Sequence, residues 1–294
     1  MKLGIIGNTG KEGLDDAVCM LVGKLRRSGI GFLIDREIVE RFRKVAAEVG
    51  SDQCAGTDDC IAQSDMVVAF GGDGTILAAA RSIGPRETPI LGINLGKLGF
   101  LAELAPDEIE DVVGSILREN YVIEERMVLE GTFPQLPGTT IHALNDIVVD
   151  KARYSLLIDL ETYIDDLFAV TYRADGLVIS TPTGSTAYAL SNGGPIVIPT
   201  SGVIGITPVA PHTLNGRPLI IPNHCSIRVV AKADGDEVVF YADGRSEVTI
   251  TPPAEVVVRE AKYKVRLVKR SDRSYFDVLR AKLLWGHDPR SADR

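Results

Sequence analysis

Residues 66–75 read Met-Val-Val-Ala-Phe-Gly-Gly-Asp-Gly-Thr, a short apolar run that ends abruptly in a glycine-rich turn. A run this short, apolar on both faces and bounded by glycines, is typical of a central parallel strand. Helical spacing follows over Thr75–Ser82, and Thr75 can cap that helix. Backbone N–H groups at such a strand-to-helix turn favour phosphate oxygens. The stretch therefore predicts a parallel α/β sheet with an anion site at its edge.

The residues around this stretch continue the same pattern. Apolar runs, helical spacing and glycine punctuation predict further strands and helices in the first third of the chain. The strands are Leu3–Ile6, Ile30–Ile34 and Pro89–Ile93, and the helices are Asp15–Arg27, Arg36–Val49 and Pro106–Glu119. Strict alternation of strand and helix predicts a parallel sheet with helices on its faces.

The pattern changes near residue 120. From Tyr121 to Arg270 the chain is mostly alternating or β-branched segments separated by turn residues, which predicts a β-rich, sandwich-like domain. Its expected strands include Ser155–Thr162, Ser226–Ala231, Glu237–Ala242 and Glu255–Val268. Helical spacing returns over residues 274–286, a helix that we expect to pack back on the first domain. We therefore predict an α/β fold with a parallel-sheet domain over residues 1–120 and a β-rich domain over residues 121–273.

Composition limits the classes of function. The chain has 294 residues and a net charge of −8, which speaks against nonspecific nucleic-acid binding and against a polybasic membrane anchor. It contains no apolar run approaching about 18 residues, and its four cysteines are scattered, so we expect a cytoplasmic protein with reduced thiols. An acidic chain that handles phosphates must neutralise them locally, with backbone amides, a few cations and a divalent metal.

Asp73 is the unusual residue of the glycine turn, because a carboxylate repels phosphate. Three roles are open from the turn alone. Asp73 accepts a proton from an attacking hydroxyl, or it holds a metal that bridges phosphates. Alternatively, it accepts hydrogen bonds from the amides of its own loop, as Asp does in many tight turns.

Three further segments combine polar groups with a strand end. In residues 173–188 a strand ends in a Thr/Ser/Gly turn. Its hydroxyl and amide groups could bind a phosphate or a ribose, and it is equally plausible as an ordinary turn exposed to solvent. Asn145-Asp146 begins an apolar strand. Its side chains either hydrogen-bond to a ribose or an adenine edge or form an Asx turn that starts the strand. Gly92–Leu101 is a glycine-spaced loop directly after a buried strand, where parallel sheets bind ligands.

Several familiar signatures are absent from the sequence. There is no G-x-x-x-x-G-K-[ST] loop and no strand-linked G-x-G-x-x-G. The four histidines lack metal-ligand spacing, and no Ser or Cys sits in a nucleophile elbow. The common Walker, Rossmann and serine-hydrolase motifs are thus excluded.

Gly71–Thr75 and Asp175–Tyr188 together resemble the two signature segments of the NAD kinase family. Gly-Gly-Asp-Gly-Thr alone is shared with diacylglycerol and sphingosine kinases, whereas the second segment is much more specific. The resemblance extends over nearly the whole chain and includes Gly92–Leu101, Asn145-Asp146, Pro208–Leu214, Arg217-Pro218 and Asp243-Gly244.

The resemblance implies a reaction, the transfer of the γ-phosphoryl group of ATP, or of a phosphoryl group of polyphosphate, to the 2′-hydroxyl of the adenosine ribose of NAD. It implies that Asp73 is the general base and that Mg²⁺ or another divalent metal assists. The residues implied to bind the phosphoryl donor are Gly71, Gly72, Gly74 and Thr75. The residues implied to bind NAD are Asp73, Gly74, Phe100, Asn145, Asp146, Asp175, Thr183, Thr186, Ala187, Tyr188 and Ala210.

The resemblance also implies a homodimer or homotetramer, because Asp175 in this family typically reaches the ligand of a neighbouring subunit. The alternatives are a diacylglycerol-kinase-like lipid kinase and a non-catalytic dinucleotide sensor. The lipid kinase leaves Asp175–Tyr188 unexplained, and the sequence has no basic or apolar stretch suited to a membrane surface.

Overall fold

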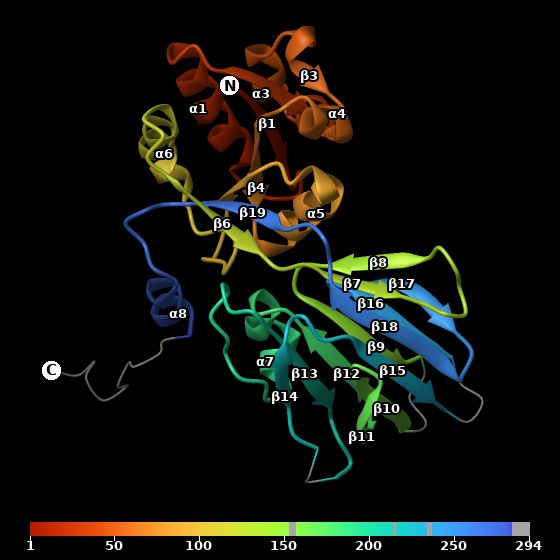
Figure 1. The fold of residues 1–294 in the computed structure, drawn as a ribbon. Helices are drawn as coiled ribbons and strands as arrows, with labels where there is room; N and C mark the ends of the chain where they lie inside the picture. Colours follow the sequence, from red (N-terminus) through yellow and green to blue (C-terminus); the bar gives the residue numbers. More distant parts are fainter. Residues whose placement is uncertain (153–156, 214–215, 234–236, 284–294) are drawn as a thin grey trace, which may run out of the picture. The chain divides into compact units, whose positions relative to one another are not determined.

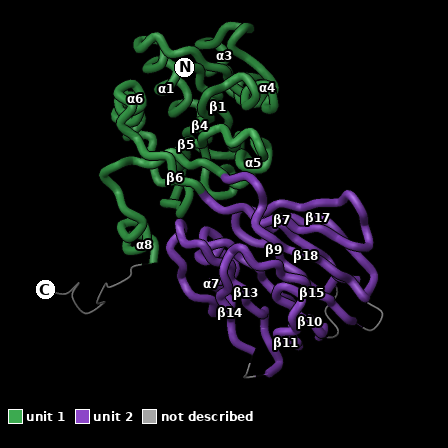
Figure 2. The backbone as a smooth tube through the Cα atoms, in the orientation of Figure 1, with its two compact units in different colours: residues 1–125, 265–294 green, residues 126–264 purple. Residues whose placement is uncertain are grey.

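The computed structural model of the chain describes residues 1–152, 157–213, 216–233 and 237–283. Three parts of the sequence expectations lie outside the described residues: the first two residues of the strand 155–162, Leu214, and residues 284–286 of the final helix. The chain divides into two compact units (Figure 2). Unit 1 comprises Met1–Glu125 together with the chain from Val265 onward, and unit 2 comprises Arg126–Lys264.

Unit 1 alternates strands and helices along the chain (Figure 1). Its strands are β1 (Lys2–Gly7), β2 (Gly31–Asp35), β3 (Cys54–Ala55), β4 (Met66–Gly71), β5 (Ile90–Asn94), β6 (Val122–Arg126, whose last residue belongs to unit 2) and β19 (Val265–Lys269). Its α-helices are α1 (Leu14–Arg27), α2 (Arg36–Arg41), α3 (Arg43–Glu48), α4 (Thr57–Ala62), α5 (Asp73–Ile83), α6 (Ile109–Leu117) and α8 (Tyr275–Leu283). Three short 3-10 turns complete it: Ser51–Gln53, Gly84–Arg86 and Pro106–Glu108.

The strands of unit 1 form one seven-stranded sheet in the order β3-β2-β1-β4-β5-β19-β6. The pairs that join β3, β2, β1, β4, β5 and β19 are all parallel. Strand β4 lies in the middle and is buried along its whole length, as its apolar run predicts. The parallel α/β class of the first domain is thereby confirmed.

Helices cover both faces of this sheet because its strands are apolar on both sides. Val68 and Phe70 of β4 share a buried core with α1 and α6, whereas α4 and α5 pack against each other and against β4. The core residues of α1 recur at helical spacing: Leu14, Ala17, Val18, Leu21, Val22 and Leu25.

Two helices differ from their expected bounds. The expected helix Arg36–Val49 is broken at Phe42, whose backbone is extended (φ −118°, ψ 102°) and whose side chain packs against the core. Helix α5 begins at Asp73, directly after Gly72, so Thr75 lies inside its first turn instead of capping it.

Unit 2 is almost entirely β-structure. Its strands are β7 (Leu129–Thr132), β8 (Thr140–Ala143), β9 (Asp146–Lys151), β10 (Ile158–Ile164), β11 (Leu167–Ala174), β12 (Gly176–Ser180), β13 (Val203–Val209), β14 (Leu219–Pro222), β15 (Ile227–Lys232), β16 (Val238–Ala242), β17 (Arg245–Ile250) and β18 (Ala254–Glu260). Between β12 and β13 come a 3-10 turn (Thr183–Thr186) and the short helix α7 (Tyr188–Ser191).

Two six-stranded sheets make up unit 2, with orders β11-β10-β15-β18-β7-β8 and β14-β13-β12-β9-β16-β17. Neighbouring strands in both sheets pair antiparallel, and alternate residues of both sheets fill one shared apolar core. Phe240 of β16 is fully buried there, with its ring 4.9 Å from that of Phe133 in an edge-to-face contact. The β-rich, sandwich-like second domain is confirmed.

The boundary between the units falls differently from the expected domain limits. The expected strand Glu255–Val268 is two strands that separate at Lys264: β18 belongs to unit 2, and β19 pairs in parallel with β5 of unit 1. Leu267 of β19 lies opposite Ile90, so the chain returns to unit 1 by adding a strand to its sheet.

The remaining expectations concern thiols and membranes. Cys19, Cys54, Cys60 and Cys225 are all free, and burial raises the pKa of the Cys60 thiol to about 12, which keeps it protonated and unreactive. Each helix in the described part of the chain is too short or too polar to cross a bilayer.

The shared core predicts a large difference between two phenylalanines of unit 2. Phe240→Ala empties a fully buried site and should lower the free energy of unfolding by about 3–5 kcal/mol. The control Phe168→Ala removes a ring that is 60% exposed and should cost less than about 1.5 kcal/mol. Urea titration followed by circular dichroism measures both; equal losses would contradict the assigned core.

Candidate functional site

The strand order of unit 1 creates a site where ligands bind in such folds. Strand β1 lies between β2 and β4, so the chain leaves β1 toward one side of the sheet and later returns on the other. Open α/β sheets bind ligands beyond the carboxyl ends of the strands at this switch in direction. Ligand pockets usually have volumes of about 300–1,000 Å³.

A cavity of about 450 Å³ lies at that position, lined by Gly7, Asn8, Lys11, Gly72, Gly74, Thr75 and Ala78. Lys11 is exposed, and the Asn8 side chain accepts the N–H of Gly10 at 3.0 Å. Backbone N–H groups of glycines and one ammonium group are typical of a site that binds an anion. The cavity brings together Gly72, Gly74 and Thr75, as expected, and adds Asn8 and Lys11, which the sequence motifs do not indicate.

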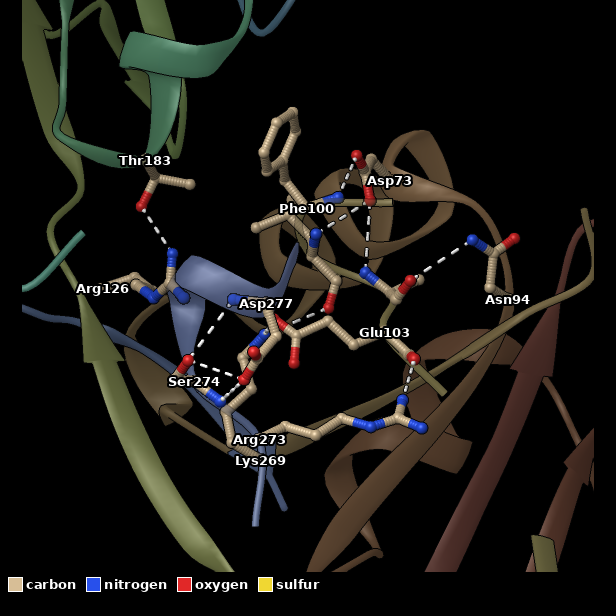
Figure 3. Close-up of polar contacts among 12 residues, drawn as sticks. Asp73, Asn94, Phe100, Glu103, Arg126, Thr183, Lys269, Arg273, Ser274 and Asp277 are labelled. Atoms are coloured by element: carbon tan, nitrogen blue, oxygen red, sulfur yellow. Dashed lines mark hydrogen bonds and ion pairs between the residues drawn. The ribbon is translucent and has the colours of Figure 1, made fainter. Parts of the chain in front are cut away.

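Asp73 lies in the turn beside this cavity, between Gly72 and Gly74. Its carboxylate accepts three backbone N–H groups of the loop after β5 (Figure 3). Oδ2 accepts from Phe100 at 2.9 Å, and Oδ1 accepts from Leu101 at 2.9 Å and from Ala102 at 3.2 Å. Of the three open roles, amide capping is therefore present, but it serves a different loop from the one that carries Asp73.

Gly99 permits this approach. A Cβ atom at Gly99 would lie 2.0 Å from Oδ1 of Asp73, so any other residue would push the carboxylate away. The loop is also held from within, because the buried Asn94 side chain donates to the carbonyl of Lys97 at 2.6 Å and accepts the N–H of Gly96 at 2.9 Å. Gly92–Leu101 thus forms a fixed frame for one face of the carboxylate.

Unit 2 carries a second cavity, of about 360 Å³. Its lining residues are Asn145, Asp146, Val148, Asp150, Ala187, Tyr188, Tyr241, Asp243 and Gly244. Two tyrosines and several polar groups around a partly apolar hollow are typical of small-molecule sites. Four residues expected to bind a dinucleotide meet here: Asn145, Asp146, Ala187 and Tyr188.

The segment that carries Asn145 and Asp146 is fixed from two sides. The Asp243 carboxylate accepts the N–H groups of Leu144, Asn145 and Asp146, at 3.0, 2.7 and 3.3 Å. On the other side, Gly184 lies so close that a Cβ there would be 2.0 Å from the carbonyl oxygen of Asn145. The backbone at the cavity mouth is therefore held in one position.

The carboxyl group of Asp146 has an unusual environment. Burial raises its pKa to about 7, and the charge of Asp243 adds to that effect. Burial also raises the pKa of Asp150, at the far end of the same strand. Near neutral pH, Asp146 is therefore partly protonated and can both donate and accept hydrogen bonds.

The other expected residues of unit 2 do not line this cavity. Thr183 is buried and its hydroxyl accepts from Nη1 of Arg126 at 3.2 Å (Figure 3). The hydroxyl of Thr186 donates to the carbonyl of Thr183, and Asp175 pairs with Lys151 at 2.5 Å. Ala210 is exposed, with a positive φ of 43°. Sequence motifs missed Asp150 and Tyr241, which reach the cavity through strand pairing of β9 with β16.

Side chains alone do not form a metal cage in the described residues. No group of three or more His, Cys, Asp or Glu side chains there has metal-binding geometry. Asp73 is the carboxylate of the glycine turn, and it faces N–H donors, which are partners of an anion. The residues present therefore do not fit a metal site built from protein ligands only.

The raised pKa of Asp146 predicts a pH-dependent stability. In the unfolded chain the carboxyl ionises near 3.8 and in the folded chain near 7, so the folded chain holds one extra proton between these values. Its stability contribution is full below about pH 4 and is lost as the pH rises through about 7. Asp146→Asn should therefore flatten the fall in melting temperature between about pH 4 and about pH 8.

The control for this experiment is Asp166→Asn, because the Asp166 side chain is 92% exposed. Asp166→Asn should show the same fall in melting temperature with pH as the unsubstituted protein. Identical slopes for Asp146→Asn and the original chain, measured by scanning calorimetry, would show that Asp146 ionises normally.

Comparisons of the sequence with known proteins point to one protein family over nearly the whole chain. The ATP-NAD kinase N-terminal domain family matches residues 3–121, and the ATP-NAD kinase C-terminal domain family matches residues 144–270. The NAD kinase of Bacteroides fragilis is 40% identical over 291 residues, covering 99% of this chain and 100% of the relative. The NAD kinase of Moorella thermoacetica is 40% identical over 287 residues, covering 97% of this chain and 90% of the relative.

Solved structures agree with this result. The crystal structure of yeast NADH kinase complexed with NADH superposes with a TM-score of 0.88 at 25% identity, covering 98% of this chain and 89% of that chain. An NAD kinase from Archaeoglobus fulgidus in complex with ATP, at 23% identity and a TM-score of 0.73 over 96% of this chain and 99% of that chain, shares the fold. The chain belongs to the NAD kinase family of enzymes.

Proposed function

We propose that the protein transfers the γ-phosphoryl group of ATP, or a phosphoryl group of another donor such as polyphosphate, to the 2′-hydroxyl of the adenosine ribose of NAD, giving NADP. The observation that carries the proposal is the position of Asp73, a partly exposed carboxylate between two glycines that line an anion-suited cavity. Full-length similarity to NAD kinases supports the choice of substrate.

Asp73 is proposed as the general base. A sugar hydroxyl is a weak acid, so a positioned carboxylate assists by taking its proton as the oxygen attacks. Oδ1 of Asp73 accepts two N–H groups, whereas Oδ2 accepts one N–H group and has a longer contact of 3.5 Å with the ammonium of Lys282, and we assign Oδ2 as the proton acceptor. The frame of amides holds the carboxylate at a fixed angle, and phosphoryl transfer depends chiefly on such positioning.

The donor phosphates are assigned to the cavity of unit 1. Its glycine backbone and Lys11 supply positive partners in a chain whose net charge is −8. Gly71 completes the turn, at the end of β4. Lys11 is the cation that the acidic composition requires near the phosphates.

The dinucleotide is assigned to the cavity of unit 2. In unit 2, Asn145, Asp146, Ala187 and Tyr188 line one cavity, and a partly protonated Asp146 suits a ribose hydroxyl, which both donates and accepts. Roles for Asp175, Thr183, Thr186 and Ala210, and for Gly74 and Phe100 of unit 1, rest on the family resemblance. The yeast structure with NADH supports a nicotinamide dinucleotide as ligand.

Mg²⁺ or another divalent metal is part of the proposal, although the described residues offer no protein-only site for it. When bound, such a metal neutralises charge on the phosphates, and in kinases it is carried largely by those phosphates. The proposal also includes a cytoplasmic location and a homodimeric or homotetrameric assembly.

The direct test is an assay of NADP formation from NAD with ATP and, separately, with polyphosphate, each with and without Mg²⁺. NADP should form with at least one donor, and a chelator of divalent metals should stop it. If the protein binds NAD tightly but forms NADP under none of these conditions, the result would favour a dinucleotide sensor. Phosphorylation of diacylglycerol in place of NAD would favour a lipid kinase.

Asp73→Asn tests the assigned base. Asn keeps an oxygen for the N–H groups of Leu101 and Ala102 but cannot take the proton, so kcat should fall by about a hundredfold or more while NAD still binds. Initial rates and isothermal calorimetry measure the two quantities. Asp107→Asn, at an exposed position of the same unit, is the control and should leave kcat unchanged. An unchanged kcat in Asp73→Asn would remove Asp73 from the mechanism.

A further inference from the structure

The C-terminal segment of unit 1 is bound to the chain that follows the amide frame of Asp73. Lys269 pairs with Glu103 at 2.5 Å, and both side chains are largely buried, with 10% and 13% exposed. Arg270 and Arg273 both pair with Glu108, at 3.1 and 2.5 Å. Arg273 also donates to the carbonyl of Glu103 at 3.0 Å. Residues 269–273 are therefore tied to residues 103–108 by a network of charged contacts.

Helix α8 continues from this anchor and is itself well fixed. Ser274 and Asp277 cap its start reciprocally: the Asp277 carboxylate accepts the N–H of Ser274 at 2.9 Å, and the Ser274 hydroxyl accepts the N–H of Asp277 at 3.3 Å (Figure 3). Val278 and Leu279 are buried. The buried pair and the cap set the direction of the helix within unit 1.

Lys282 lies one turn after Leu279, and residues three apart share a helix face. Its ammonium nitrogen is 3.5 Å from Oδ2 of Asp73 and 4.6 Å from the centre of the Phe100 ring. The contact is half-sheltered, since the side chains of Lys282 and Asp73 are 32% and 29% exposed. The ammonium thus contacts the carboxylate oxygen that is assigned to take the proton, and it is held there by an aromatic face.

We propose that Lys282 is a positioning residue for Asp73 and that helix α8 is a part of the phosphoryl-transfer site. Backbone amides fix Oδ1 twice, but Oδ2 has a single amide partner. The ammonium of Lys282 supplies the second contact to Oδ2, so the carboxylate keeps both its charge partner and its rotamer when the substrate hydroxyl arrives. This inference rests on the proposed role of Asp73.

The first experiment compares three variants at saturating NAD and ATP. Lys282→Met should lower kcat by about tenfold, the scale of one hydrogen bond between charged groups, with the KM of NAD unchanged within about twofold. Lys282→Arg keeps a cation and should restore most of the rate. The control is Arg280→Met, because Arg280 sits on the same helix, is 58% exposed and pairs with Asp277. It should have the kcat of the original chain.

The second experiment separates positioning from a direct role through a double-mutant cycle. If Lys282 acts through Asp73, the variant Asp73→Asn/Lys282→Met has the kcat of Asp73→Asn alone. If the double variant instead loses kcat by the product of the two single-variant losses, Lys282 acts independently of Asp73, for example on a phosphate, and the inference is overturned. A raised kcat in Lys282→Met would also overturn it, because the lysine would then be an inhibitor of the base.

The two proposals fail in different ways. If Asp73→Asn alone keeps its rate, the proposed base is wrong whatever Lys282 does. If Asp73→Asn loses its rate while Lys282→Met does not, only the role of helix α8 is wrong. Thermal melting of each variant shows whether it is folded, and equal losses of rate in Lys282→Met and Lys282→Arg would assign the residue a purely structural role.

Discussion

The organisation of unit 1 depends on one carboxylate that accepts three consecutive backbone N–H groups. Buried amides need partners, and an ionised acceptor binds them more strongly than a neutral one does. Asp73 supplies this acceptor from the start of α5, and Gly99 leaves room for it. The loop after β5 takes its shape around that carboxylate. Residues 103–108 follow directly and carry the ion pairs that hold the C-terminal segment.

Unit 2 repeats the device with different residues. Asp243 accepts the N–H groups of three consecutive residues, 144–146, and it stands beside a glycine as Asp73 does. In both units a short carboxylate side chain fixes a loop by accepting its backbone N–H groups. The consequence for Asp146 is electrostatic, because a buried carboxyl close to the charge of Asp243 holds its proton to about pH 7.

Local patterns predicted much of this arrangement. The apolar run 66–70 and the glycines after it marked a central strand and its turn, and alternation marked the layers of both units. The break at Phe42 was not predictable, because it depends on how one side chain packs in the core. Lys11, Tyr241 and Lys282 were not predictable either. They reach their sites through strand order or helix docking, and no spacing in the sequence records those contacts.

The return of the chain at Val265 has a consequence for the order of synthesis. Unit 2 is one continuous stretch of chain, whereas unit 1 requires both its first 125 residues and the strand and helix that follow Lys264. Nascent chains emerge from the N-terminus onward, and compact units fold as they become complete. Unit 2 can therefore fold while the sheet of unit 1 still lacks β19. Lys282 follows unit 2 in the sequence, so its contact with Asp73 can form only after the whole of unit 2 has been synthesised.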